Sequence, residues 1–247
     1  MYINIFAQLI FGLCLGYSIA TFSESFFHHH IGHASPRLRR FWARHPFIGK
    51  PFLNAYYEHH TIHHARTFRK DFVTQFTSPE EEEKLYQSMP KDRRDFIRKE
   101  EYGVTLKGFG IVMFVLPIVP SVPFIYLLFG LWVLLGALFP MFVLYPLMSK
   151  WIHRMLHKAD ENLLHECWRI EIWVMNTLYM RTVLVDHYLH HEYVLCNFNL
   201  LRGGDYLRGY HRNANEKELL ALRLIGAARA HGRQGSPVGK PTRKIRT

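Results

Sequence analysis

The chain contains the cluster H-x-x-H-H twice, at positions far apart in the sequence. One copy lies in EHHTIHH, residues 58–64, and the other in DHYLHHE, residues 186–192. On a helix, residues three and four positions apart share one face, so each cluster can aim several imidazoles at one point. Two such clusters that meet in space would build a multi-histidine centre. The need to bring these two clusters together constrains the fold more than any other feature of the chain.

Two further histidine pairs complete the pattern. FHHHIGH, residues 27–33, offers His33 with either His28 or His29, and HRMLH offers His153 and His157. The four clusters together give ten expected metal ligands: His28, His33, His60, His63, His64, His153, His157, His187, His190 and His191. His29, His30 and His59 are the alternatives if the register shifts by one residue. His45, His165, His211 and His231 match no cluster, so we interpret them as ordinary surface or interfacial residues.

Ten imidazoles exceed what one zinc ion can use, because a structural zinc takes four ligands and a catalytic zinc takes three and a water. They suit two ions of higher coordination number, and imidazole binds iron, zinc, copper and nickel. An oxygen-activating pair of iron ions is the preferred interpretation, with zinc able to replace iron in purified protein. Ligation needs neutral imidazole, so acid should release the metal.

Two other uses of histidine fit less well. Haem ligation places one histidine on each side of a macrocycle, which does not match triplets within five residues. Metal transport needs ligands buried within the membrane spans, whereas these clusters fall at the ends of the apolar segments. Three separated cysteines without a C-x-x-C pair also argue against thiolate zinc sites, iron–sulfur clusters and a disulfide framework.

Carboxylates flank the clusters. Ligating histidines usually donate their other N–H to such groups, so the expected partners are Glu24, Glu58, Asp186 and Glu192. A solvated charge is the alternative for each of them.

The apolar residues are segregated into long segments. The chain is 49% hydrophobic, yet its mean hydropathy is only −0.08. A membrane helix needs about 20 apolar residues, which predicts spans at about 3–27, 108–120 and 124–148. The second and third form a hairpin that turns at VPSVP, residues 119–123. The N-terminal segment lacks the basic start and small-residue cleavage site of a signal peptide. We therefore predict an all-α membrane bundle with a cytosolic helical cap that carries the histidines.

Charge indicates the orientation of this bundle. Arginines follow the first span, and a basic excess in short loops marks the cytoplasmic side. Every cluster then lies on that side of a multi-pass protein of the bacterial inner membrane or the endoplasmic reticulum. The net charge of +11 fits an anionic membrane face, and no nucleic-acid partner is expected.

The remaining segments complete the expected organisation. Residues 170–185 are apolar but interrupted, which favours an interfacial or packed helix over a span. TSPEEEEKLYQ predicts a helix with Ser78 as N-cap and Pro79 as its first residue. The catalytic domain is expected to cover residues 1–211. Residues 212–247 form a basic tail, with a short amphipathic helix and then disorder.

The motifs resemble those of the fatty acid hydroxylase/sterol desaturase superfamily over residues 24–209. ESFFHHHIGH is similar to E-x-x-x-H-x-x-x-x-H, which favours His28 over His29. HHTIHHARTFRKDFVTQFTSP, HRMLH and DHYLHHEYVLCNFNLLRGGDYLRG resemble the other family motifs, although Gly204 stands where a tryptophan is expected. The resemblance implies two metals in a helical bundle and a lipid-like substrate that enters from the bilayer.

These observations predict an O2-dependent di-iron hydroxylase of a lipid or fatty-acyl substrate. Oxidation of an unactivated C–H bond needs a metal, and O2 needs two external electrons. The chain has no cysteine cluster, no G-x-G-x-x-G and no H-P-G-G, so a separate electron-transfer protein is expected. Desaturation or carbon-chain cleavage at the same site remains an alternative. A zinc hydrolase, for which H-E-x-x-H is absent, and a non-catalytic metal-binding membrane protein are alternatives of other classes.

Overall fold

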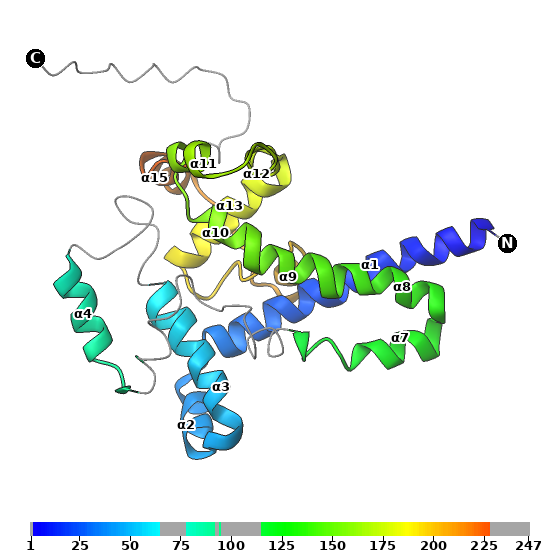
Figure 1. Cartoon of the computed structure of the whole chain (residues 1–247), viewed down its shortest axis with the longest axis horizontal. Coiled ribbons are helices and arrows are strands. Elements are labelled where there is room, and N and C mark those ends of the chain that lie inside the picture. Colours follow the sequence, from blue (N-terminus) through cyan, green and yellow to red (C-terminus); the bar gives the residue numbers. More distant parts are fainter. Residues whose placement is uncertain (1, 65–77, 92–93, 95–114, 228–247) are drawn as a thin grey trace, which may run out of the picture.

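All regular elements in the described part of the chain are helices (Figure 1). The computed structural model describes residues 2–64, 78–91, 94 and 115–227. The predicted all-α class is therefore confirmed. The C-terminal stretch predicted to be disordered and the apolar residues 108–114 lie outside the described residues.

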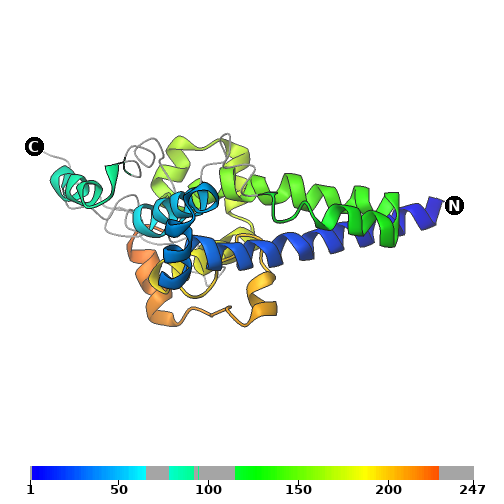
Figure 2. The ribbon, with the colours of Figure 1, turned by 90° about the horizontal axis from the view of Figure 1, so that it is seen from below.

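Two long apolar helices form the axis of the molecule. Helix α1 (Tyr2–Phe27) continues into a π-helical segment, η1 (His28–Gly32). The second helix runs continuously from Leu131 to Leu156 over 26 residues. Its parts are α8 (Leu131–Phe139), η3 (Pro140–Leu144), α9 (Tyr145–Leu147), η4 (Met148–Ile152) and α10 (His153–Leu156). Both helices are long and apolar enough to cross a membrane, and they lie side by side (Figures 1 and 2).

Glycines allow these two helices to approach closely. A Cβ atom added at Gly16 would lie 2.3 Å from the carbonyl oxygen of Ala137, and one at Gly12 would lie 2.1 Å from that of Val133. Gly136 makes the reciprocal approach to Leu9, at 2.3 Å. Small residues spaced by four let helix backbones meet where lipid supplies no hydrophobic driving force.

A hairpin precedes the second long helix, but it joins other residues than the predicted hairpin, whose first arm lies mostly outside the described residues. The chain reverses at Gly130, where φ is 83°, between α7 (Ser121–Phe129) and α8. The observed helix differs in its bounds from the span expected at 124–148, because residues 124–129 belong to α7 and the long helix ends at Leu156. Pro123 is tolerated because it lies in the first turn of α7, where no helical hydrogen bond is lost. Residues 116–120 also form a turn, which includes the first two residues of VPSVP.

Shorter helices gather at the C-terminal ends of the two long helices (Figure 1). They are α2 (Pro36–Arg44), α3 (Pro46–Tyr56), η2 (Tyr57–His63), α4 (Pro79–Gln87), α11 (Asp160–Glu166), α12 (Arg169–Met175), α13 (Leu178–Glu192), α14 (Gly204–Arg208) and α15 (Glu216–Leu224). Helix α4 begins at Pro79 as predicted, and α15 is the predicted short C-terminal helix.

The segment 170–185 divides into two helices with different environments. Helix α12 exposes Trp168 just before it and Trp173 within it, as an interfacial helix would. Thr177 then caps α13 by accepting a hydrogen bond from the amide of Met180. Helix α13 carries Leu184 and other fully buried residues into the main hydrophobic core. The core thereby anchors α13, which carries His187, His190 and His191.

The close glycine contact generates a prediction about stability. We expect Gly16→Leu to destabilise the protein by about 3 kcal/mol, because the new side chain must push apart two backbones. For a chain of this size, that loss lowers the melting temperature by about 6–12 °C. Ala7→Leu adds the same kind of bulk to an exposed face of α1 and is the matched control. Thermal melting in detergent measures both variants; equal melting temperatures would show that the glycine contact contributes nothing.

Candidate metal centre

Nine histidines gather into two groups at the end of the long helices. The first histidine group contains His28, His33, His59, His64 and His190. The second histidine group contains His63, His157, His187 and His191. Within each group, one ring nitrogen from every residue lies within 4.8 Å of all the others. Each group can therefore hold a metal ion.

In the first histidine group, the Nε2 atoms face one another. The Nε2 atom of His59 lies 2.7 Å from that of His28 and 3.2 Å from those of His33 and His64. The Nε2 atoms of His33 and His190 are 3.0 Å apart. Three separate parts of the chain thus contribute nitrogen atoms to one point: η1 with the residue after it, η2 with the residue after it, and α13.

The second histidine group repeats this arrangement. The Nε2 atoms of His187 and His157 are 2.8 Å apart, and those of His191 and His63 are 3.1 Å apart. His153 lies at its margin, with its Nε2 atom 3.1 Å from that of His187 and 3.3 Å from that of His157. When His153 is counted with the second histidine group, each group offers five nitrogens.

Neighbouring residues in the sequence divide between the two groups. His63 and His64 belong to different groups, and so do His190 and His191. A helix turns by about 100° per residue, so adjacent side chains diverge and reach separate points. The rings of His64 and His191, one from each group, stack with centroids 4.2 Å apart. The two groups are therefore in direct contact.

Two π-helical segments set the register of the first group. The amide of His33 donates to the carbonyl of His28 over 3.1 Å, and the amide of His64 donates to that of His59, also over 3.1 Å. Both are i to i+5 bonds, which place residues five apart on one face. His28 pairs with His33 and His59 pairs with His64 for this reason. Insertions of this kind are frequent at functional sites.

His59 is the member of the groups that the sequence analysis did not favour. The expected triplet assumed α-helical spacing and chose His60, His63 and His64. The spacing of five between His28 and His33 recurs between His59 and His64, and this repetition is the signal that could have identified His59.

His60 lies behind the first group instead. Its Nδ1 atom is 2.8 Å from the Nδ1 atom of His33, on the side of that ring away from the group. If His33 presents a lone pair at Nε2, its Nδ1–H donates to His60. His60 thus orients His33. His29 stacks on Phe198 and His30 on His29, and neither belongs to a group.

Backbone carbonyls fix two of the tautomers. His28 donates from Nδ1 to the carbonyl of Phe198 over 2.6 Å, and His190 donates from Nδ1 to that of Cys196 over 2.8 Å. A carbonyl can only accept, so both rings carry their proton on Nδ1 and a lone pair on Nε2. These lone pairs point into the first group, which is the state required for a metal ligand.

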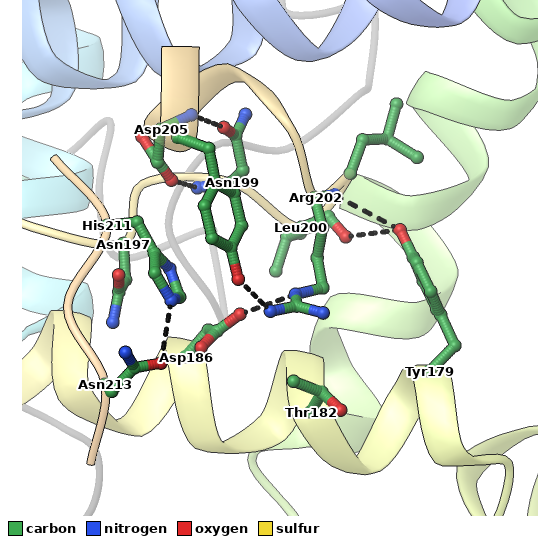
Figure 3. A network of polar contacts seen from close by, with 12 residues as sticks. Tyr179, Thr182, Asp186, Asn197, Asn199, Leu200, Arg202, Asp205, His211 and Asn213 are labelled. Carbon is green, nitrogen blue, oxygen red and sulfur yellow. Dashed lines mark hydrogen bonds and ion pairs between the residues drawn. The ribbon is translucent and has the colours of Figure 1, made fainter. Parts of the chain in front are cut away.

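A buried polar network holds the segment that supplies these carbonyls. Glu24 on α1 accepts hydrogen bonds from the amides of Leu200 and Leu201 over 3.1 and 2.9 Å. Asp205 accepts from the amide of Asn199, while the side chain of Asn199 accepts from the amide of Asp205, both over 2.8 Å (Figure 3). The network fixes the backbone directly after Phe198, and through it the ring of His28.

Two of the four flanking carboxylates, Asp186 and Glu24, contact groups other than histidines. Asp186 forms an ion pair with Arg202 over 2.8 Å (Figure 3), and the contacts of Glu24 go to the 199–201 segment rather than to a histidine. Glu58 is buried beside the first group, and Glu192 is exposed. The hydrogen bonds that orient His28 and His190 thus come from backbone oxygens, which carry no net charge.

The electrostatic environment keeps the clustered imidazoles neutral. Burial lowers the pKa of His63, His187 and His190 well below the usual value, and repulsion between neighbouring imidazoles lowers it further. Burial is also the first cause that lowers the pKa of the other members of the two groups outside the long helices: His33, His59, His64, His157 and His191. At neutral pH their lone pairs are available.

The nitrogen geometry fits a bound metal. A metal–imidazole bond is about 2.0–2.1 Å long, so adjacent nitrogens around one ion lie about 3.0 Å apart in an octahedron and about 3.4 Å in a tetrahedron. The observed separations of 2.7–3.3 Å fall close to these edges. Lone pairs that face each other at such distances repel unless a cation lies between them. Imidazole-only donor sets suit iron, zinc, copper and nickel.

A cavity of about 110 Å³ adjoins both groups. Its walls include His28 and His59 from the first group, His187 from the second, and His153. The rest of the lining is mostly apolar: Phe27, Ile31, Gly32, Ala55, Tyr145 and Leu200, with Glu24 and Ser149. A small apolar ligand in this cavity would contact the histidine rings directly.

Comparison with known proteins gives no match: no protein-family model, no curated protein and no solved structure is similar to this chain. The geometry of the two histidine groups is therefore the basis for any functional assignment.

The lowered histidine pKa values generate a prediction for the metal-free protein. Unfolding exposes these imidazoles, which then bind protons below about pH 6.5, while the folded groups stay neutral. The unfolded state therefore gains protons as the pH falls, and each such histidine removes about 1.4 kcal/mol of stability per pH unit below that value. We expect the melting temperature to be level at about pH 7.5–8.5 and to fall steeply towards about pH 5.5. His165→Gln, an exposed control, should keep this profile; a melting temperature independent of pH would contradict the expectation.

The register of η2 generates a second prediction. We expect His59→Ala to lose about one metal ion per chain, because His59 lies inside the first histidine group. His60→Ala should keep both ions, with weaker binding at the first group, because His60 only orients His33. Elemental analysis of the purified variants measures this. If His60→Ala loses an ion and His59→Ala keeps both, the α-helical register expected from the sequence is correct and the π-helical register is wrong.

Proposed function

We propose that the chain is a membrane-bound di-iron oxygenase that hydroxylates a C–H bond of a lipid or fatty-acyl substrate, using O2 and electrons from a separate protein. The observation that carries the proposal is the pair of contacting histidine groups beside an apolar cavity, at the end of two helices long enough to span a bilayer. The resemblance of the motifs to the fatty acid hydroxylase/sterol desaturase superfamily supports the same reading.

The metal pair gives the proposal its chemical class. When bound, two iron ions would supply the activation of O2 and the oxidation of an unactivated C–H bond, which side chains alone cannot perform. The first histidine group would hold one ion, and the second, with His153, would hold the other. The neutral, imidazole-rich set suits iron better than magnesium or calcium, which prefer oxygen ligands.

The residues of the chain would position the substrate. Phe27, Ile31 and Leu200 line the cavity at the margin of the long helices, where an acyl chain could leave the bilayer and remain in apolar surroundings. His28 and His187 bring the histidine groups to the wall of the same cavity. A volume of about 110 Å³ fits a segment of a slim chain rather than a polycyclic ring.

The buried histidines and the polar network would also protect the reaction. His157 and His190 are fully buried, so bulk water is excluded from that side of both groups. Glu24 and Asp205 hold the 197–205 segment, so that the carbonyl of Phe198 keeps His28 in its ligating tautomer. A preorganised site of this kind keeps its ligand geometry through repeated turnover.

The decisive experiment compares the lipids of cells with and without the gene by mass spectrometry, together with the iron content of the purified protein. We expect two irons per chain and a lipid product that gains one oxygen. His63→Ala and His190→Ala each remove one group's ligand, so both should abolish the product. His165→Ala changes an exposed histidine outside the groups and should keep full activity.

Other outcomes identify the alternatives. A product that loses two hydrogens or a carbon would indicate a desaturase or a chain-cleaving oxidase at the same centre. A single zinc with hydrolysed lipid would indicate a hydrolase, and protein without metal or product would indicate a non-catalytic role. Ala55→Leu narrows the cavity without removing a histidine; the proposal expects it to lower product while the iron content stays at two per chain.

A further inference from the structure

A second cavity lies in the hairpin of α2 and α3, outside the cavity that adjoins the histidine groups. Its volume is about 500 Å³, which is within the usual range for small-molecule sites. Buried Trp42 and Leu53 contribute to its apolar lining, and Arg39 and Arg40 contribute its charge. Among the described residues that line it, no carboxylate balances these two arginines.

Arg39 is held in position but is not saturated with hydrogen bonds. Its guanidinium lies over the ring of Tyr56, with 4.5 Å between Cζ and the ring centroid. Its Nε atom is buried and has no hydrogen-bond partner among the described residues. A buried donor without a partner costs about 1–3 kcal/mol, and a ligand oxygen would remove this cost. Arginine presents a planar fork that matches phosphate oxygens.

The location of the cavity indicates the source of the phosphate. Helix α2 begins at Pro36, four residues after the first apolar helix ends at Gly32 (Figure 1). The hairpin also exposes large apolar side chains: Phe47 is 97% exposed, and Ile48 and Phe41 are 63% and 53% exposed. Exposed aromatic and aliphatic residues beside arginines are typical of a helix that lies in the headgroup region of a membrane.

We propose that the cavity between α2 and α3 binds the headgroup of an anionic phospholipid, with Arg39 and Arg40 on the phosphate and with Trp42 and Leu53 against the start of the acyl chains. The apolar lining favours a lipid over a soluble phosphate, because a soluble phosphate has no apolar part that could contact Trp42. The two uncompensated arginines distinguish it from a zwitterionic lipid, whose own cation they would repel.

The test measures lipid binding by native mass spectrometry of the full-length protein in detergent. Phosphatidylglycerol, phosphatidylcholine and inorganic phosphate are the probes. Arg39→Gln/Arg40→Gln removes both cavity arginines. Arg37→Gln/Arg44→Gln removes the same charge from the same helix without touching the cavity and is the matched control. Arg40→Gln alone is added because Arg40 is exposed and, among the described residues, lies over no aromatic ring, so this variant should fold.

We expect one tightly bound phosphatidylglycerol, with phosphatidylcholine bound at least about tenfold more weakly. Arg39→Gln/Arg40→Gln should weaken phosphatidylglycerol binding by about tenfold or more, Arg40→Gln by a smaller factor, and the control pair by less than about twofold. Equal losses in the two double variants would show a diffuse charge effect and overturn the site. Displacement of the lipid by equimolar inorganic phosphate, or no selectivity over phosphatidylcholine, would overturn the lipid assignment. Metal content should stay unchanged throughout, so this result is independent of the proposed oxygenase function.

Discussion

Neutral imidazole rings direct their nitrogen atoms towards one another in two buried groups. The rest of the structure depends on this arrangement. Each ring loses the hydrogen bonds that it made to water, and the Nε2 atoms approach to within 2.7–3.3 Å of one another. Rings whose proton is held on Nδ1, as in His28 and His190, present lone pairs that repel one another in a low-dielectric interior, so the folded chain must hold them in place. The hydrophobic core beneath α13 and the close packing of α1 against α8 supply the rigidity for this purpose.

The segment between α13 and α14 connects this rigidity to the metal centre. Its carbonyls accept hydrogen bonds from His28 and His190, and its amides donate to Glu24 and Asp205. One short stretch therefore ties α1 to α13 and sets the orientation of two rings at the same time. A polar network of this kind specifies one arrangement, because every buried member depends on its partner being in place. Asn199 contributes both its amide and its side chain.

Much of this architecture could be predicted from the sequence, because the signals are local. The apolar lengths indicated the long helices, and Ser78 followed by Pro79 indicated the start of α4. The histidine clusters indicated where the chain would converge. The reversal at Gly130 could not be placed, because glycine and proline both signal turns and Pro123 is tolerated in the first turn of a helix. His59 was missed because a single π-helical insertion changes the spacing of a shared face from four to five.

The direction of the helices at the centre has an electrostatic consequence. All four histidine sets lie at helix C-termini: η1 ends before His33, η2 before His64, α10 before His157, and α13 includes His190 in its last turn. The C-terminal end of a helix carries about half a negative charge from its aligned peptide dipoles. Four such ends converge on a site whose orienting hydrogen bonds come from neutral carbonyls. The backbone itself can thus provide a negative potential that favours a cation, even where the carboxylates are engaged in holding the fold.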